Sequence, residues 1–505
     1  MQCPFTGGDL SPANWRHDCR QDHGTTKMKP NQHPMQLIPV VAIPIFLAIA
    51  NQTMVSVALP AIGADLGALS RLPWLIIGYM LALTIAGPVY GALGDNYGRH
   101  KMLIGALLIY IIGAFICTFA NTLEMLAAGR LVQGFGGGGL MSLSQALIGQ
   151  LVRPRDRGRA QGYVASIGVV ASTLGPLMGG FLVDIYGWRS LFLFTVPLAV
   201  ISMGILLTRR FPKPAGPPRA FDTSGFLWLN FFVICWTMAL EFIKTPGQLH
   251  LSLLAVIGGA VGLWMLIRSQ KSGANPLFPP ALFRIKAVSM ASAMTVFHGA
   301  ALVSLVTIVP LFQNIVRGDD TVEIALSLLA LTVAFGLSGI ITGNLITITG
   351  RTAIFPTVSL LIAGAGIVFI ALFGAEISHR ALIATYTIIG LNIGSVMAVI
   401  HTTVQHATPD NLRGRAAGTV TFCRSIGAVL GTTAVSLILF KNAPLTDGSQ
   451  AAIASLFTQS SETDPALLAV WKDAFRLAFL TIVVFVAGEW AMAAATPARR
   501  ISETD

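Results

Sequence analysis

The sequence predicts an all-α polytopic membrane protein with about 14 transmembrane helices, arranged as two parallel six-helix bundles plus an inserted helix pair. The first of three observations behind this fold class is composition: 11% of the 505 residues are charged, 54% are hydrophobic, and the mean hydropathy is +0.72. So few charges cannot cover a water-facing surface, so most of the surface must face lipid. The other two observations are a series of helix-length apolar runs and an internal repeat.

The apolar runs begin at Leu37 and continue almost to the end of the sequence. Residues 1–36 are polar without periodicity, and we expect a disordered tail there, with Met28 and Met35 as alternative start positions. Taking about 20 residues per crossing, the expected spans are 37–59, 73–93, 102–120, 124–150, 160–183, 190–208, 224–243, 250–269, 287–309, 324–349, 353–374, 380–405, 413–440 and 470–495.

The distribution of Lys and Arg predicts the orientation of the spans. Segments on the same side as the N-terminus hold 23 of the 33 basic residues. Because basic residues concentrate in cytoplasmic loops, we expect a multi-pass protein of the cell (inner) membrane with both termini cytoplasmic. The net charge of +11 is then explained by membrane topology, without nucleic-acid binding.

Two motifs occur twice, which predicts two halves in parallel orientation. GALGDNYGR at 91–99 matches GNLITITGR at 343–351, and RGRAQG at 157–162 matches RGRAAG at 413–418. Repeats of the same order and orientation are typical of transporters with two related halves. At the second offset, the further matched pairs are Gly134 with Gly390 and Gly138 with Gly394.

The repeat sets the expected domain organisation. We expect an N-terminal six-helix bundle at 37–208 and a C-terminal one at 287–495. The segment 209–286 starts with the Pro-rich stretch FPKPAGPP and holds two spans that match neither half, so it is interpreted as a linker with two extra transmembrane helices. Residues 496–505 are expected to be a cytoplasmic tail.

Nothing in the sequence indicates an enzyme, a cofactor or a metal site. The five cysteines include no C-x-x-C pair, and we find no nucleophile–base or metal-ligand set. The GFGGGG run at 134–139 lacks the Lys-Ser/Thr ending of a phosphate loop. Because no ATPase module is recognisable, uphill transport would have to use an ion gradient.

Several motifs resemble the major facilitator superfamily, specifically its fourteen-span drug:proton antiporter group, over about residues 37–495. GALGDNYGRHKML at 91–103 resembles the superfamily's signature loop between spans two and three. RLVQGFGGGGL at 130–140 is similar to the fourth-span motif with a membrane arginine, here Arg130, which the resemblance links to proton transfer. VPLFQ at 309–313 and CRSIGAVLG around Arg424 also resemble the group.

The first- and fifth-span motifs also resemble this group, with one departure. In ANQTMVSVALPAIGADLG at 50–67, Asn51 stands where the group usually has an aspartate. A buried acid can carry a proton, whereas asparagine cannot change its charge. Either another group carries the proton, or coupling differs. ASTLGPLMGG at 171–180 resembles the antiporter motif, and its agreeing residues are Gly175, Pro176, Gly179 and Gly180.

Charged residues within spans are candidates for proton coupling or the central cavity. Arg130 lies about two turns inside its span, where a charge indicates function unless it snorkels to the interface. Glu241 lies near the outer end of span seven beside Lys244, so an exposed ion pair is the simpler interpretation. Glu124 and Glu489, also near span ends, are expected to be interfacial.

Two histidines and several polar residues complete the candidates. His298 and His401 lie within spans nine and twelve; a buried neutral histidine is the commoner case, and substrate contact or proton relay is the functional alternative. His401 aligns with Gln145 through the second repeat offset. Arg424 is the deepest charge and needs water, an acid or backbone carbonyls. The remaining cavity candidates are Gln313 and Asn392.

The corner at 87–103 is expected to form a cytoplasmic gate. Its residues are Gly91, Asp95, Gly98, Arg99 and Lys101. Its glycines allow two helices to meet in a tight turn. We expect Asp95 to find cationic neighbours in the next inner loop, 153–159, and to latch the outward-open state. The counterpart position holds Thr347, so the latch is expected to be one-sided.

The leading functional prediction is a secondary transporter that alternates access and exports small amphipathic compounds or drugs in exchange for protons. The alternative is uptake of a small metabolite or vitamin, for example riboflavin, by the same fold. A membrane enzyme or receptor without transport is a third hypothesis and lacks a catalytic cluster. The expected partners are a small-molecule substrate, the lipid bilayer and protons, with a monomeric chain and no nucleic acid.

Overall fold

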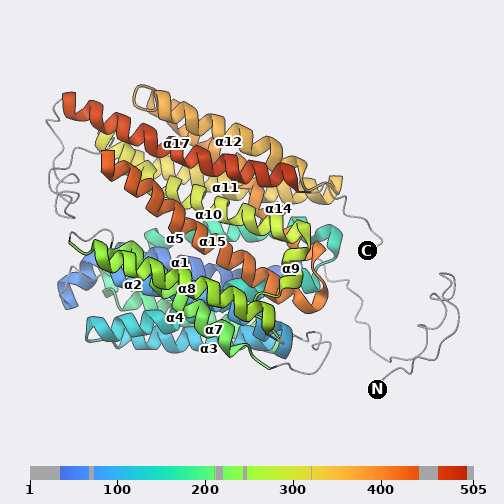
Figure 1. Ribbon diagram of the computed structural model, residues 1–505. Coiled ribbons are helices and arrows are strands. Elements are labelled where there is room, and N and C mark those ends of the chain that lie inside the picture. Colours follow the sequence, from blue (N-terminus) through green and yellow to red (C-terminus); the bar gives the residue numbers. More distant parts are fainter. Residues whose placement is uncertain are drawn as a thin grey trace, which may run out of the picture. The chain divides into compact units, whose positions relative to one another are not determined.

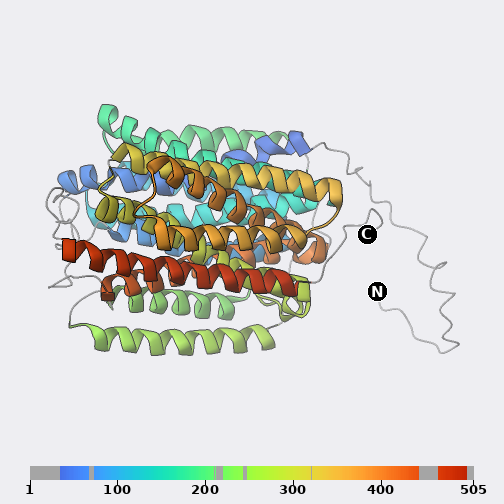
Figure 2. The ribbon, with the colours of Figure 1, turned by 90° about the horizontal axis from the view of Figure 1, so that it is seen from above.

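In the computed structural model of the chain, the structure describes residues 34–66, 73–209, 211, 220–242, 247–273, 275–319, 321–442 and 465–496. Within these residues the regular structure is helical and no strand occurs. Figures 1 and 2 show the long helices running alongside one another. The prediction of an all-α protein is confirmed.

Six long helices come before the insert. They are α1 (Pro34–Leu66), α2 (Pro73–Tyr97), α3 (Arg99–Thr118), α4 (Leu123–Leu151), α5 (Arg157–Tyr186) and α6 (Ser190–Thr208). Gly98 alone separates α2 from α3, and its φ of 99° lies in the region that favours glycine. The Thr122 side chain caps α4 by accepting a hydrogen bond from the Met125 N–H at 3.2 Å.

The insert and the second half follow. Their helices are α7 (Thr223–Phe242), α8 (Leu249–Ser272), the short α9 (Pro280–Arg284), α10 (Lys286–Phe312), α11 (Thr321–Thr349), α12 (Ile354–Phe373), α13 (His379–Ile393), α14 (Ser395–Ala407), α15 (Arg413–Asn442) and α17 (Pro465–Ala495). One π-helical turn, Gln313–Arg317, continues α10. The expected span 380–405 is interrupted at Gly394, so it consists of α13 and α14.

Twelve helical segments of the described chain are long and apolar enough to cross a membrane. The other two expected spans are α4, which is rich in glycine, and α7, whose described apolar part, Thr223–Ala239, is shorter. The helices therefore lie at all fourteen expected positions. The additional short helix α9 was not predicted.

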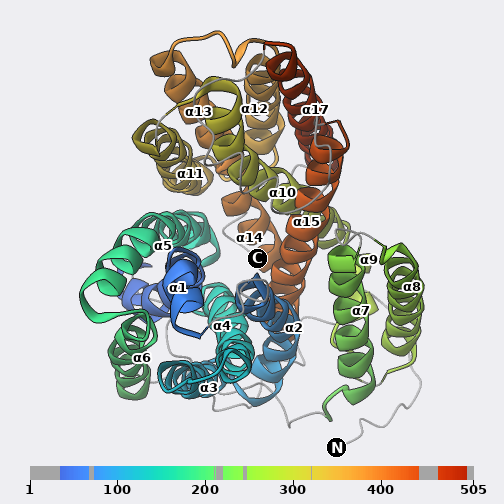
Figure 3. The same ribbon diagram turned by 90° about the vertical axis from the view of Figure 1, so that its left-hand side faces the viewer.

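The helices pack in groups that can be followed end-on in Figure 3. Helices α1–α6 pack on one another, α10–α17 pack on one another, and α7 packs against α8. The two larger groups meet where α2 contacts α15 and where α5 contacts α11. The α7–α8 pair lies against α2 and α15 through apolar residues that include Phe232 and Phe422. The predicted domain limits stay a prediction.

Matched glycines line both of these contacts, which we call the α2–α15 seam and the α5–α11 seam. A methyl group on Gly158 of α5 would lie 2.8 Å from the carbonyl oxygen of Gly343 on α11. The repeat partners of these two residues, Gly414 and Gly91, meet in the same way, with 2.5 Å from the Gly414 methyl position to the Gly91 oxygen. Only glycine permits such close backbone approach.

Candidate functional site

Arg130, on α4, is fully buried among polar groups from three helices. Its guanidinium donates hydrogen bonds to Asn51 Oδ1 on α1, to Gln133 Oε1 at 2.9 Å, and to the Leu75 carbonyl on α2 at 3.3 Å. It also lies 4.1 Å from the centre of the Tyr79 ring, a cation–π contact. The burial rules out a snorkelling side chain. Within the described chain, no carboxylate pairs with this cation.

The Arg130 cluster keeps unused hydrogen-bonding capacity. Arg130 Nη2 and Asn51 Nδ2 are buried, and neither has a partner among the described residues. A buried donor without an acceptor costs about 1–3 kcal/mol. Both groups are donors, so the cluster suits a bound acceptor such as a water, a carbonyl or an anionic group.

The motif at 171–180 packs α5 onto the part of α1 that carries Asn51. A methyl group on Gly175 would collide with the Thr53 hydroxyl and lie 3.2 Å from the Ala50 carbonyl oxygen. One on Gly179 would lie 3.1 Å from the Met54 Cα. These glycines therefore hold α1 close to α5. The other two residues of the motif, Pro176 and Gly180, lie within α5.

In the second half, His298 on α10 and Glu489 on α17 form a fully buried pair. His298 Nδ1 lies 2.9 Å from Glu489 Oε1. The expectation that Glu489 is interfacial is wrong. Although it lies about two turns from the end of its helix, its side chain faces α10 and not the membrane surface. The sequence signal for its burial is that Glu489 lies inside the expected span 470–495.

His401 and Arg424 lie on helices that neighbour this pair. His401, on α14, is 8% exposed, and α14 packs against α10 and α15, which carry His298 and Arg424. The structure therefore places these three candidates of the second half on helices that pack on one another. Gln145, the repeat partner of His401, is buried on α4, and its backbone carbonyl accepts a hydrogen bond from Gln405 Nε2 at 2.9 Å.

The remaining cavity candidates are not brought into either cluster by any described contact. Gln313 is fully buried in the π-helical turn after α10. Asn392 is half-buried, and its Nδ2 donates to the Ile388 carbonyl of its own helix at 2.8 Å. The side chain of Glu241 lies outside the described residues, as does Lys244.

At the predicted gate, Asp95 joins the two halves. Its carboxylate accepts hydrogen bonds from Arg99 Nη2 at 2.9 Å and from the N–H groups of Gly414 and Arg415 at 2.8 and 2.9 Å. The expectation of partners from the loop 153–159 is therefore wrong. The first N–H groups of α15 take their place, because a helix N-terminus has unpaired donors and favours an anion.

Further hydrogen bonds join the halves at the same end. Arg99 Nη2 donates to the Asp410 carbonyl at 2.7 Å, and Arg157 Nη1 donates to the Gln405 carbonyl at 3.1 Å. Arg99 and Arg157 are both buried, so water does not compete for these bonds. Lys101, by contrast, is exposed at the start of α3.

The α5–α11 seam has its own side-chain contact. Arg159 Nε donates to Asn344 Oδ1 at 2.9 Å. Thr347, the counterpart of Asp95, bonds only to the Gly343 carbonyl of its own helix, at 3.0 Å. Among the described residues the carboxylate contact of Asp95 therefore has no counterpart at Thr347, and the one-sided latch stays a prediction. The Arg159–Asn344 bond was not predicted.

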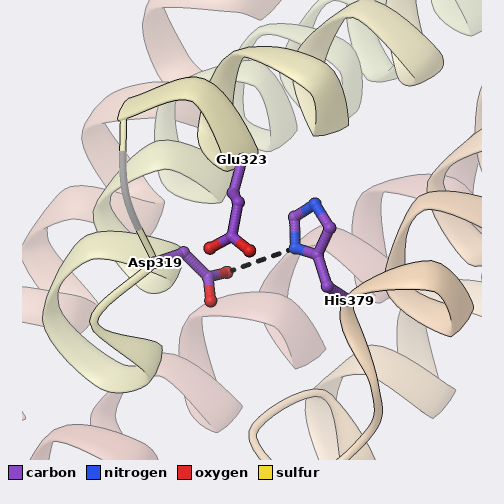
Figure 4. A group of neighbouring side chains, drawn as sticks. All are labelled: Asp319, Glu323 and His379. Carbon is purple, nitrogen blue, oxygen red and sulfur yellow. Dashed lines mark ion pairs between the residues drawn. The ribbon is translucent and has the colours of Figure 1, made fainter.

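A group that could hold a cation lies at the opposite ends of the helices. Ligand atoms of Asp319, Glu323 and His379 lie within 4.8 Å of one another (Figure 4). Asp319 already pairs with Arg317 at 2.9 Å, and Arg317 also donates to the Gly374 carbonyl at 2.7 Å. These bonds connect the end of α10 to the loop after α12, so the group is accounted for by a structural role.

Comparison with known proteins identifies the family. The sequence model described as "Major Facilitator Superfamily" matches residues 41–432. An uncharacterised MFS-type transporter of Mycobacterium tuberculosis is 30% identical over 77% of this chain and 57% of its own length. The multidrug transporter protein MdtP of Bacillus subtilis is 27% identical over 80% of this chain and 75% of its own length. Multidrug resistance protein 3 of the same species is 24% identical over 77% of this chain and 76% of its own length.

Solved structures show the same fold. The proton:xylose symporter XylE aligns with a TM-score of 0.64 at 12% identity, covering 93% of this chain and 97% of its own. The human organic anion transporter MFSD10 aligns with a TM-score of 0.59 at 13% identity, covering 89% of this chain and 100% of its own. The chain spans little more than half the length of the mycobacterial relative, 57%. The motif resemblance and the expectation that the protein is not an enzyme are confirmed: the chain belongs to the major facilitator superfamily.

Proposed function

We propose that this protein is a secondary transporter that exports small amphipathic compounds or drugs from the cytoplasm in exchange for protons. One observation carries the proposal: repeat-matched glycines join the two helix groups along two seams, and buried hydrogen bonds close those seams at one end. Two related groups held this way can rock about the seams once the bonds at that end break.

The Lys and Arg distribution supports a cytoplasmic location for the closed end, with both chain termini on that side and the protein in the inner membrane. Asp95 then acts as a latch that favours the outward-open state. When the N–H groups of Gly414 and Arg415 leave its carboxylate, the α2–α15 seam can open toward the cytoplasm. A monomer is sufficient for this cycle because both halves lie in one chain.

Export is supported by the names of two relatives, a multidrug transporter and a multidrug resistance protein. The alternative, uptake of a metabolite or vitamin such as riboflavin, rested on the missing acid at Asn51. The buried Glu489 removes that motive, because it provides an intramembrane acid elsewhere. The relatives' names do not favour uptake.

An expression screen that scores export and uptake together tests the proposal. The chain is expressed in a bacterial host that lacks its own efflux pumps and cannot make riboflavin. We expect lower accumulation of the amphipathic cation ethidium and no rescue of growth on low riboflavin. An Arg130→Met variant, checked for equal membrane abundance, should accumulate ethidium like the empty host. Riboflavin rescue with unchanged ethidium accumulation would contradict the proposal.

A further inference from the structure

We propose that His298 and Glu489 together form a proton-binding site, in which one proton is held by the pair inside the second half of the transporter. The inference rests on the proposed proton exchange and names the residues that would carry the proton. It is based on four features of the site: close helix packing, complete burial, unused polar atoms and ionisable residues on neighbouring helices.

A close approach of α10 and α17 creates the pair. A methyl group on Gly488 would lie 2.7 Å from the Phe297 ring, so the two helices nearly touch beside the pair. The next residue along each helix, Glu489 and His298, is then within hydrogen-bond distance, at 2.9 Å. Both side chains are fully buried. The geometry therefore fixes the imidazole against the carboxyl group and keeps bulk water away.

The pair uses only part of its hydrogen-bonding capacity. His298 Nε2 and Glu489 Oε2 are buried and have no partner among the described residues. A pair that served only to hold two helices together would be expected to satisfy both groups, since unpaired buried polar atoms are costly. The two spare atoms provide an entry point for a proton and an exit point on the other member of the pair.

The charge balance limits the pair to one proton at rest. With one proton the net charge is zero, and complete burial favours the form with a neutral acid and a neutral imidazole over the ion pair. Loss of that proton leaves a buried charge of −1, and gain of a second leaves +1, both of which are costly in a low-polarity interior. Release therefore requires contact with water or a compensating positive charge.

The backbone of Arg424, a residue of α15, packs against the residue that follows His298. Gly299, beside His298, packs on α15 so closely that a methyl group there would lie 3.0 Å from the Ala428 nitrogen and would clash with the Arg424 carbonyl oxygen. His401 lies on α14, which packs against both α10 and α15. Helix α12, which packs on α17, carries no titratable residue. Arg424 and His401 are therefore ionisable residues on helices that pack against α10, the helix of His298.

The proposed step is a simple proton transfer. When the site faces the outer solution, a proton from water binds the deprotonated pair, and the net charge of the pair changes from −1 to zero. When the site faces the cytoplasm, the same proton returns to water and the charge returns to −1. Contact with water in each of these orientations lowers the cost of the −1 state, because water solvates the charge.

Infrared difference spectroscopy on the full-length protein in detergent tests proton binding without any substrate. We expect a carboxylic-acid C=O band that titrates with pH in the wild type and is absent in Glu489→Gln. Asp473→Asn, an exposed acid on the same helix, is the matched control and should retain the band. His298→Gln should keep the band but change the pH at which it titrates. A band that survives in Glu489→Gln, or that titrates unchanged in His298→Gln, would overturn the proposal.

Transport assays separate this inference from the proposed function. In proteoliposomes, Glu489→Gln should lower pH-gradient-driven ethidium flux at least about tenfold, a typical size for a coupling effect, while Asp473→Asn should not. Gradient-driven flux that persists in Glu489→Gln would overturn the proton site. A wild type that moves no ethidium yet keeps the titrating band would contradict the proposed function and leave the proton site supported.

Discussion

At the residue scale, the first half presents a cation that pairs with no acid among the residues that the structure describes. Arg130 is held by amide and carbonyl oxygens, including Asn51 Oδ1, and by the Tyr79 ring. A buried guanidinium does not lose its charge, so this cluster keeps a fixed positive charge through the cycle. Among the ion pairs of the described residues, only His298–Glu489, in the second half, has both side chains fully buried.

Arg130→Lys should lower ethidium flux by more than about tenfold although the charge is kept. A lysine ammonium is a compact charge on a flexible stem and lacks the planar set of donors with which the guanidinium bonds Asn51, Gln133 and the Leu75 carbonyl. The measurement is flux in proteoliposomes, with Gly105→Ala as control, because a methyl group at Gly105 would meet nothing within 4 Å. Equal flux in Arg130→Lys and wild type would show that charge alone matters.

Asp65, at the end of α1 beyond the apolar span, carries the pH-dependent prediction. Hydrogen bonds from Arg189 and then Trp188 hold the pKa of Asp65 below its usual range. A lowered carboxyl pKa stabilises the fold above the unfolded value of about 3.9, and this contribution is lost as the pH falls through the folded pKa.

Asp65→Asn should therefore cause a small decrease in the thermal unfolding midpoint at neutral pH, and the decrease should vanish in strongly acidic buffer. The effect is small because both side chains are partly exposed and water screens the pair. The measurement is thermal unfolding in detergent across a pH series. A decrease that grows as the pH falls would contradict the assignment.

Residues of both clusters can be predicted from the sequence, but their partners cannot always be. Arg130 and His298 were identified because a charge or imidazole inside a span is rarely accidental. Glu489 was misjudged because distance to a span end does not reveal which way a helix turns its side chains. The partners of Asp95 could not be predicted because they are the backbone N–H groups of Gly414 and Arg415. Residue type does not reveal which distant helix presents its backbone donors.

At the element scale, the two seams show how the repeat is used in packing. Gly134 on α4 packs on the Tyr79 carbonyl of α2, and its counterpart Gly390 on α13 packs on the Leu331 carbonyl of α11. Tyr79 and Leu331 are separated by the first repeat offset, and the two glycines by the second. Both offsets found in the sequence thus correspond to the same helix contact in each half.

Asp95→Asn should slow the transport cycle about tenfold while it leaves substrate affinity nearly unchanged. Hydrogen bonds to a charged group contribute about 1.5–3 kcal/mol each, so the variant populates the cytoplasm-closed state less and its return step becomes slower. The readout is the maximal rate and the half-saturation concentration of ethidium transport. Asp184→Asn, at an exposed acid of α5, is the control. Lost affinity at a normal rate would refute the latch.

Helix limits were harder to predict than helix positions. The first span was expected to end at residue 59, but α1 continues to Leu66, because Gly63 and Asp65 weaken the hydropathy signal of the last turns without ending the helix. The interruption at Gly394 and the short helix α9 depend on packing between helices. Repeated glycines, by contrast, predicted helix contacts well, since close backbone approach demands them.

At the scale of the whole molecule, each half contributes a different kind of ionisable group. The first half holds a fixed cation at Arg130, and the second holds an acid–imidazole pair at His298 and Glu489. The hydrogen bonds around Asp95, Arg99 and Arg157 join the halves at the end where the basic loops gather. Such an arrangement suits a carrier in which proton binding in one half and opening of the seams depend on each other.

Ethidium flux in proteoliposomes under an imposed pH gradient tests the central claim most directly. With purified protein and the cytoplasmic face oriented outward, we expect ethidium to enter the vesicles when their interior is more acidic than the bath. Collapse of the gradient by a proton ionophore should stop that uptake. Uptake that continues at the same rate without a gradient would contradict proton-coupled export.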